Sequence, residues 1–331
     1  MFSNPRTLGI LGLLVATWAW GSLFLVGKGV LSYVNPVWFT FIRYTLATAV
    51  FVVLVRWRDG SAWRKLREHA MHLAWRGLAG YGLFSVLALI GLAHSVPSHG
   101  AVIMATMPIT TQLLRWAFDG IKPTRTVLLS TSLALLGVMA VSGALTEHHA
   151  GNHNAAVGDL LTLVGTLGWI AYTRGAARLP SLSALEYSAL TALAAWPLLL
   201  LAALAGAVTS LAAAPTMADL AVSWHAFLYI AAIPSVVAVL AYNFGVKTLG
   251  VITGTAFLNF VPVSVALMSA LLGKMPQPHE MLGLLLVVCA LLFHTTAQKR
   301  LERTSSAPPL RSSTPASSAD IAPPACRTCK A

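Results

Sequence analysis

The chain has 331 residues, of which 57% are hydrophobic and only 10% charged, and its mean hydropathy is +0.74. Soluble domains carry about 25% charged residues, so a chain of this length cannot surround itself with a water-exposed surface. The formal net charge of +12 would suggest nucleic acid as a partner of a soluble protein. In a membrane protein the same excess arises from basic residues on the cytoplasmic side, so no nucleic-acid partner is inferred.

Apolar stretches recur along most of the chain, and a helix needs about 20 mostly apolar residues to cross a bilayer. The first stretch lacks the cleavage site of a removed signal peptide and is therefore taken as a span. The expected spans are 7–27, 37–55, 77–94, 100–118, 126–145, 158–174, 184–205, 225–244, 251–272 and 281–297. The predicted fold class is an all-α polytopic membrane protein with about ten transmembrane helices.

The two halves of the chain resemble each other. Val15–Trp20 is echoed by Val164–Trp169 about 149 positions later. Three further matches are about 154 positions apart: Gly91 with Gly245, Gly100 with Gly254, and Pro108 with Pro262. With five spans in each copy, the second copy enters the membrane inverted, as in many secondary transporters with one central site.

These patterns divide the chain into four parts. They are a first five-helix repeat (1–145), an extracytoplasmic loop (146–157), a second, inverted repeat (158–297) and a tail (298–331). The tail is rich in Ser, Pro, Ala and Arg, has too little apolar content to bury, and is expected to be disordered. With the N-terminus in the cytoplasm, only Lys28 and Lys274 fall on the opposite side, which indicates that both termini are cytoplasmic.

Each copy contains an ordered set of short motifs. The first copy has Trp20-Gly21-Ser22, Pro36, Arg43, Met107-Pro108, Gly120 and Pro123. The second has Gly158-Asp159-Leu160, Tyr242-Asn243, Gly250, Pro262-Val263 and Gly273. The ordered set resembles EamA-type transporters of the drug/metabolite transporter superfamily. Repeats of that family usually end in a Gly-Glu pair, whereas Ile121 and Lys274 stand at the Glu positions here.

The resemblance implies a ten-helix carrier of the bacterial inner membrane that transports a small-molecule substrate. Such carriers are commonly exporters of amino acids, small metabolites or drugs. The resemblance does not identify the substrate, the direction of transport or the coupling ion. Whether the chain forms a homodimer also stays open.

Two ionisable residues stand out within the spans. Arg43 lies seven residues beyond Pro36, hence about 10 Å into the membrane, where it could bind a carboxylate or anchor neighbouring helices through their carbonyl groups. Glu186 lies near the position that corresponds to Arg43 in the second copy. It could carry a proton during transport, but an interfacial ion pair with Arg174 or Arg178 is the favoured interpretation.

Aromatic residues share one face of two corresponding spans. Thr17, Trp20 and Phe24 follow i, i+3, i+7 spacing, and Thr166 and Trp169, with Tyr172 nearby, repeat the pattern. These faces are expected to line a substrate cavity, where aromatic rings can also hold a cation. The alternative is the ordinary enrichment of tryptophan in membrane helices.

A polar stripe and several prolines complete the set of candidates. Thr255, Asn259 and Pro262 share a face, and a proline such as Pro108 can leave carbonyl groups free toward a cavity. Hydrogen bonding between helices is the alternative for an intramembrane Asn. Tyr242 and Asn243, near the cytoplasmic end of the eighth span, are candidates for an inner gate.

Other functions are less well supported by the sequence. A metal-ion carrier would depend on Glu147, His148, His149 and His153 in the outer loop, but no fixed zinc spacing is present and a solvated loop is favoured. A membrane-embedded enzyme or lipid-handling protein would need clustered His, Asp or Glu, whereas His94 and His99 lie opposite His294. No phosphate loop, metal site or cofactor is identified, and Cys326 and Cys329 are assigned no function. The sequence predicts a secondary transporter that works by alternating access and is not an enzyme.

Overall fold

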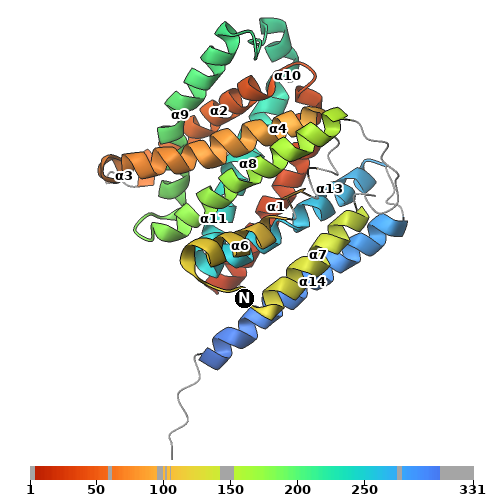
Figure 1. Ribbon diagram of the computed structural model, residues 1–331. Helices are drawn as coiled ribbons and strands as arrows, with labels where there is room; N and C mark the ends of the chain where they lie inside the picture. The colour runs from red at the N-terminus through yellow and green to blue at the C-terminus, as the bar shows by residue number, and fades with distance from the viewer. Residues whose placement is uncertain are drawn as a thin grey trace, which may run out of the picture.

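The computed structural model describes residues 4–58, 62–94, 100, 103–104, 106–141, 153–273 and 278–305, and these ranges contain helices and no β-strand (Figure 1). The first half contains α1 (Pro5–Val30), α2 (Pro36–Arg58), α3 (Ala62–Gly77), η1 (Leu78–Phe84), α4 (Ser85–His94), α6 (Met107–Asp119) and α7 (Arg125–Val141). The second half contains α8 (His153–Arg178), α9 (Ala184–Val208), α10 (Met217–Ile230), η2 (Ala231–Val237), α11 (Ala238–Leu249), α12 (Val251–Phe257), α13 (Phe260–Leu271) and α14 (Pro278–Ser305).

Seven helical stretches of the described chain are long and apolar enough to cross a membrane, by length and composition. Three of them join consecutive elements, namely 62–94, 217–249 and 251–271. Two shorter apolar helices, Arg125–Gly137 and Met281–His294, lie in two more of the expected spans. The all-helical membrane fold is confirmed, while the count of ten spans and their inverted arrangement remain predictions.

Local sequence explains where several helices begin and end. Asn4 caps α1 ahead of Pro5, and Ser183 with Glu186 forms a capping box at the start of α9. Gly120 ends α6 with a φ of 67°, a left-handed conformation that glycine adopts without strain. Three boundaries extend beyond the predicted spans: α3 adds a helical segment before residue 77, α8 begins at His153 and α14 continues to Ser305. Positions 142–152 and 306–331 lie outside the described residues.

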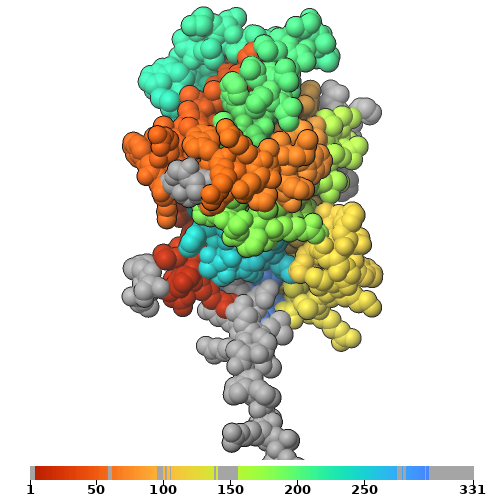
Figure 2. Space-filling view, turned by 90° about the vertical axis from the view of Figure 1, so that its left-hand side faces the viewer, coloured from red at the N-terminus to blue at the C-terminus, as the bar shows by residue number. Residues whose placement is uncertain are grey.

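Helices from opposite halves of the chain pack against each other. α1 lies against α11, and α4 lies against α8. Because α1 corresponds to α8 and α4 to α11 in the repeat, the two contacts are equivalent. In Figure 2 the orange residues of α3 and α4 lie directly beside the yellow-green residues of α8. α2 packs on α9, and α7 with α14 forms a pair beside the other helices (Figure 1). The largest cluster of buried apolar side chains draws on both halves, so the two copies share one core.

Two π-helical turns interrupt the helices that contain α4 and α11. η1 begins at Leu78 and η2 at Ala231, about 153 positions apart, which is within one residue of the spacing between Gly91 and Gly245. Such turns insert an extra residue into a helix and are frequent at functional sites. Pro234 lies inside η2, where its missing N–H cannot complete a helical hydrogen bond.

Candidate functional site

A central cavity lies between α1, α2, α4 and α8, and its volume is about 50 Å³. Four of the residues predicted from the sequence line it: Trp20, Phe24, Arg43 and Trp169. Residues from both copies therefore meet at one site. Tyr44, Ser85 and Met104 also line this cavity, and the sequence had not indicated them.

Arg43 is the one cation among the described lining residues of this cavity, and only 5% of the residue is exposed. Its Nη2 donates to the Tyr44 hydroxyl at 2.6 Å and to Ser85 Oγ at 3.0 Å. Its guanidinium carbon lies 4.4 Å from the centre of the Tyr44 ring. The buried Nε has no hydrogen-bond partner, and no described carboxylate forms an ion pair with Arg43. Within the described chain, Arg43 therefore bonds to side-chain hydroxyls, and not to the carbonyl groups of neighbouring helices that the alternative interpretation predicted.

Aromatic rings from the two copies form the wall of the cavity. The rings of Trp20 and Trp169 meet edge to face, with centroids 5.1 Å apart, and Phe84 lies 5.3 Å from Trp169. The indole N–H of Trp20 donates to the carbonyl oxygen of Pro234 at 3.0 Å. This bond ties α1 of the first copy to the π-helical turn η2 of the second.

A buried polar cluster, here called the tyrosine cluster, consists of Tyr81, Tyr172, Tyr187, Ser188 and Asn243. The hydroxyls of Tyr81 and Tyr172 are 2.7 Å apart. Asn243 Nδ2 donates to the Tyr172 hydroxyl at 2.6 Å and to Ser188 Oγ at 2.7 Å, and the Tyr187 hydroxyl donates to the Tyr172 carbonyl at 2.6 Å. Tyr172 and Asn243 were predicted candidates; Tyr81, Tyr187 and Ser188 share no sequence motif with them. Tyr242, the neighbour of Asn243, packs on Trp20 with ring centroids 5.1 Å apart.

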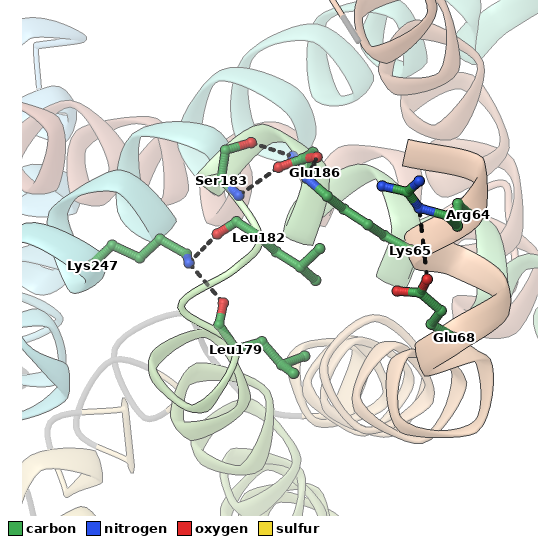
Figure 3. A network of polar contacts seen from close by, with 8 residues as sticks. All are labelled: Arg64, Lys65, Glu68, Leu179, Leu182, Ser183, Glu186 and Lys247. Carbon is green, nitrogen blue, oxygen red and sulfur yellow. Dashed lines mark hydrogen bonds and ion pairs between the residues drawn. The ribbon is translucent and has the colours of Figure 1, made fainter. Parts of the chain in front are cut away.

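Charged side chains lie together at one end of the bundle, where α3 and α9 begin and α6, α8 and α11 end. We call it the N-terminal end, because Gly9, near the start of α1, lies against Leu249 at the end of α11. Glu186 Oε1 accepts a hydrogen bond from Lys65 Nζ at 2.5 Å, and its other oxygen caps Ser183 (Figure 3). Lys247 donates to the carbonyls of Leu179 and Leu182 in the connection before α9. Glu186 is therefore paired at the edge of the bundle, with Lys65 rather than with Arg174 or Arg178.

Arg174 and Arg178 instead hold Asp119. Arg174 Nη2 lies 2.9 Å and 2.8 Å from the two carboxylate oxygens, and Arg178 Nη2 lies 2.8 Å from one of them. These contacts join the end of α8 to the end of α6. Together with the Lys65–Glu186 pair, they join four different helices at the N-terminal end of the bundle by ion pairs.

The remaining candidates lie away from the lining of the central cavity. The hydroxyls of Thr17 and Thr166 bond to carbonyls of their own helices, at 2.9 Å to Leu13 and 2.6 Å to Leu163. Asn259 is buried at the junction of α12 and α13, and its Oδ1 has no partner. The corresponding prolines, Pro108 and Pro262, both lie buried in the first turn of a helix, α6 and α13.

Among the described residues, no three His, Cys, Asp or Glu side chains lie close enough together to hold a metal ion. Glu147, His148 and His149 of the predicted outer loop, and Cys326 and Cys329, lie outside the described residues.

Comparison with known proteins agrees with this architecture. Residues 7–143 and 156–296 each match the model of the EamA-like transporter family. The chain is 28% identical over 305 residues to the uncharacterized transporter YrdR of Bacillus subtilis (strain 168), covering 88% of this chain and 92% of the relative. The uncharacterized transporter YyaM of the same organism is 25% identical, with 82% and 88% covered.

A solved structure, described only as "Crystal structure of protein", superposes with a TM-score of 0.70 at 18% identity and covers 89% of this chain and 99% of its own. At this identity the likeness shows the fold alone. The family match to both halves, each with its own aromatic and proline positions, assigns the function class. The chain belongs to the EamA-like transporter family and is a multi-pass membrane protein.

Proposed function

We propose that the protein is a secondary transporter that exports a small molecule across the bacterial inner membrane by alternating access. The observation that carries this proposal is the central cavity, because it holds, between helices of the two copies, a buried guanidinium that forms no ion pair with a described carboxylate. An ionisable group inside a membrane protein usually faces a substrate pathway or a partner. No described partner of opposite charge is present.

The layers between the cavity and the N-terminal end support a closed gate on that side. Along α8, Trp169 lines the cavity, Tyr172 belongs to the tyrosine cluster and Arg178 pairs with Asp119. At 1.5 Å per residue these positions span about 14 Å of helix. Along the first copy, Ser85, Tyr81 and Lys65 follow the same order. Transport then requires the tyrosine cluster and the ion pairs to separate while the opposite end closes.

Matching features of the two copies support ten spans in two inverted halves. The exchanged helix pairs, the two π-helical turns and the two prolines in first turns recur at corresponding positions. Two such halves can rock against each other around one central site. The excess of Lys and Arg on one side favours cytoplasmic termini, and the substrate gradient or proton antiport is the proposed driving force.

An efflux assay over a panel of small molecules tests this proposal. Cells that overexpress the protein are compared with cells that carry the empty vector, and any compound that is exported faster is then followed in proteoliposomes. We expect Arg43→Gln to abolish the flux and Arg58→Gln, at the exposed end of the same helix α2, to leave it unchanged. If no compound in the panel is exported, or if flux in liposomes is independent of both the substrate gradient and the proton gradient, the proposal fails.

A further inference from the structure

We infer that the central cavity binds monocarboxylates with an apolar body and discriminates against amino acids and amines of the same shape. This inference names the substrate class of the site and rests on the proposed transport function for its biological meaning. The argument uses three properties of the described lining: its charge, its free hydrogen-bond donors and its aromatic wall.

The charge of the lining is positive and uncompensated. Arg43 is buried, and no described lining residue is acidic. The sequence segments next to the described lining, 95–99, 101–102 and 105, contain no Asp or Glu either. A buried charge without a partner is unfavourable, and an anion within hydrogen-bond reach restores the balance. The site is therefore complete only with an anionic ligand.

The hydrogen-bond donors of the site exceed its acceptors. Both hydrogen bonds of the guanidinium leave from Nη2, so Nη1 keeps its donors for a ligand, and the buried Nε has no described partner. The Tyr44 and Ser85 oxygens are 3.2 Å apart, and either one can donate to the other. Each hydroxyl carries one proton and their mutual contact uses one of the two, so one hydroxyl proton remains to be donated to a ligand. Two oxygens of a carboxylate match this set, since guanidinium binds carboxylates through paired N–H groups.

The same geometry disfavours an ammonium group. The α-ammonium of an amino acid lies one carbon away from its carboxylate and would sit beside the guanidinium, where like charges repel strongly in a medium of low dielectric constant. The described lining offers no carboxylate to offset that repulsion. Trp20, Phe24, Phe84 and Trp169 instead present apolar ring surface to the rest of the ligand.

The size of the cavity limits what fits in this conformation. A volume of about 50 Å³ corresponds to roughly four water-sized spheres, at about 10–15 Å³ each. The carboxylate and the first carbons of a short acid fill that space. A longer apolar tail would require the cavity to widen.

Matched sets of ligands test the inference with the purified full-length protein. One set is butyrate, 2-aminobutyrate and propylamine; the other is 3-phenylpropionate, phenylalanine and phenethylamine. Within each set the carbon skeleton is the same and only the charged groups differ. Binding is measured by calorimetry and by the rise in melting temperature at constant ionic strength and pH 7. We expect at least one anion to bind at least tenfold more tightly than the zwitterion and the amine of its set.

Three variants link the selectivity to the site. Arg43→Gln should weaken anion binding at least tenfold, and Tyr44→Phe, which removes one hydroxyl, should weaken it about fivefold. Arg58→Gln, the same change at the exposed end of α2, should bind as the wild type does. Tyr44→Phe keeps the test decisive if Arg43→Gln does not fold.

Each outcome separates this inference from the proposed function. Equal binding of zwitterion and anion, unchanged binding in both Arg43→Gln and Tyr44→Phe, or no binding of either anion would overturn the substrate class, although export of another compound could still be observed. Selective anion binding without any flux in proteoliposomes would support the site and contradict the transport proposal.

Discussion

Tyr172 is the residue on which the buried polar contacts between the two halves converge. Its hydroxyl meets Tyr81 from the first half and Asn243 from the second, and its carbonyl accepts the hydroxyl of Tyr187. All four side chains are buried. In a medium of low dielectric constant such bonds are strong, and an unpaired partner is costly. The hydroxyl of Tyr172 therefore stabilises the packing of η1, α8 and α11.

Tyr172→Phe removes that hydroxyl and leaves the Asn243 amide with one acceptor, Ser188 Oγ. We expect the free energy of unfolding to fall by about 1–3 kcal/mol, the usual cost of a buried donor left unsatisfied. Thermal melting of the purified protein measures this change. The matched control is Tyr33→Phe, because Tyr33 is half exposed and its side chain has no hydrogen bond in the described structure. Equal melting of the two variants would contradict the role assigned to Tyr172.

Glu186→Gln tests whether the carboxylate carries protons. Glu186 is paired with Lys65 and caps α9, and a glutamine can still accept the hydrogen bond of the cap. We expect the pH profile of transport to stay as in the wild type and the stability to fall by less than about 1 kcal/mol, because the partner is partly exposed. Glu68→Gln, which breaks the exposed pair with Arg64, is the control. A lost pH dependence in the Glu186 variant alone would identify this carboxylate as the proton carrier.

Arg43 could be predicted at the residue scale, whereas its partners could not. A lone arginine within an apolar span is rare enough to indicate a cavity or a partner, and the structure places it in a cavity. Ser85 comes from a different helix and follows directly after the π-helical turn η1. An inserted residue rotates every following side chain by about 100°, so helical periodicity alone gives the wrong face for Ser85.

At the scale of elements, the apolar spans could be predicted because the bilayer fixes their length. The π-helical turns could not, since no local sequence pattern marks them and their closest contacts are with other helices. Gly80 in η1 lies so close to Tyr172 that an added Cβ would be 2.6 Å from the ring. Similarly, Gly168 of α8 faces the carbonyl oxygen of Ala79. Small residues at these positions allow α8 and η1 to approach closely.

Gly168→Ala should disturb this contact. The new Cβ would lie 2.3 Å from the Ala79 carbonyl oxygen and 3.3 Å from the Phe84 nitrogen, and both are backbone atoms that cannot rotate away. We expect a loss of about 1–3 kcal/mol of stability. Gly29→Ala in α1 has no atom within 4 Å of the new Cβ and should be neutral or gain up to about 1 kcal/mol, as alanine favours helix. Melting curves of both variants decide this, and an unchanged Gly168 variant would show that the helices can separate at little cost.

At the scale of the whole molecule, the repeat in the sequence indicates which helices correspond, but it does not indicate which ends are tied together. The Lys65–Glu186 and Arg174–Asp119 pairs join residues that have no counterpart motif in the other copy. They depend on how the helices pack. These pairs lie beyond the tyrosine cluster as seen from the cavity, so they are contacts of the N-terminal end that the repeat does not predict.

If the ion pairs hold that end closed, weakening them should favour the conformation that is open there. Asp119→Asn removes the charge held by Arg174 and Arg178 and should therefore raise the access of reagents to the tyrosine cluster. The probe is Ser188→Cys, which is fully buried in this structure, in a background with Cys289, Cys326 and Cys329 changed to alanine. A membrane-impermeant thiol reagent is added to the side that carries the N-terminus. We expect labelling to become several-fold faster with Asp119→Asn.

The matched control for this labelling is Asp219→Asn, the same change at the start of α10. Asp219 caps that helix through Thr216, and an asparagine can keep the cap. Asp219 lies near the start of the helical stretch Met217–Leu249, whereas Lys247, near its end, lies at the N-terminal end of the bundle. The charge of Asp219 is therefore too far from the ion pairs to act on them. Labelling should therefore stay at the rate of the parent. Faster labelling in both variants would indicate general loosening of the fold, and an unchanged rate with Asp119→Asn would show that the pairs of Asp119 with Arg174 and Arg178 do not control access to the tyrosine cluster.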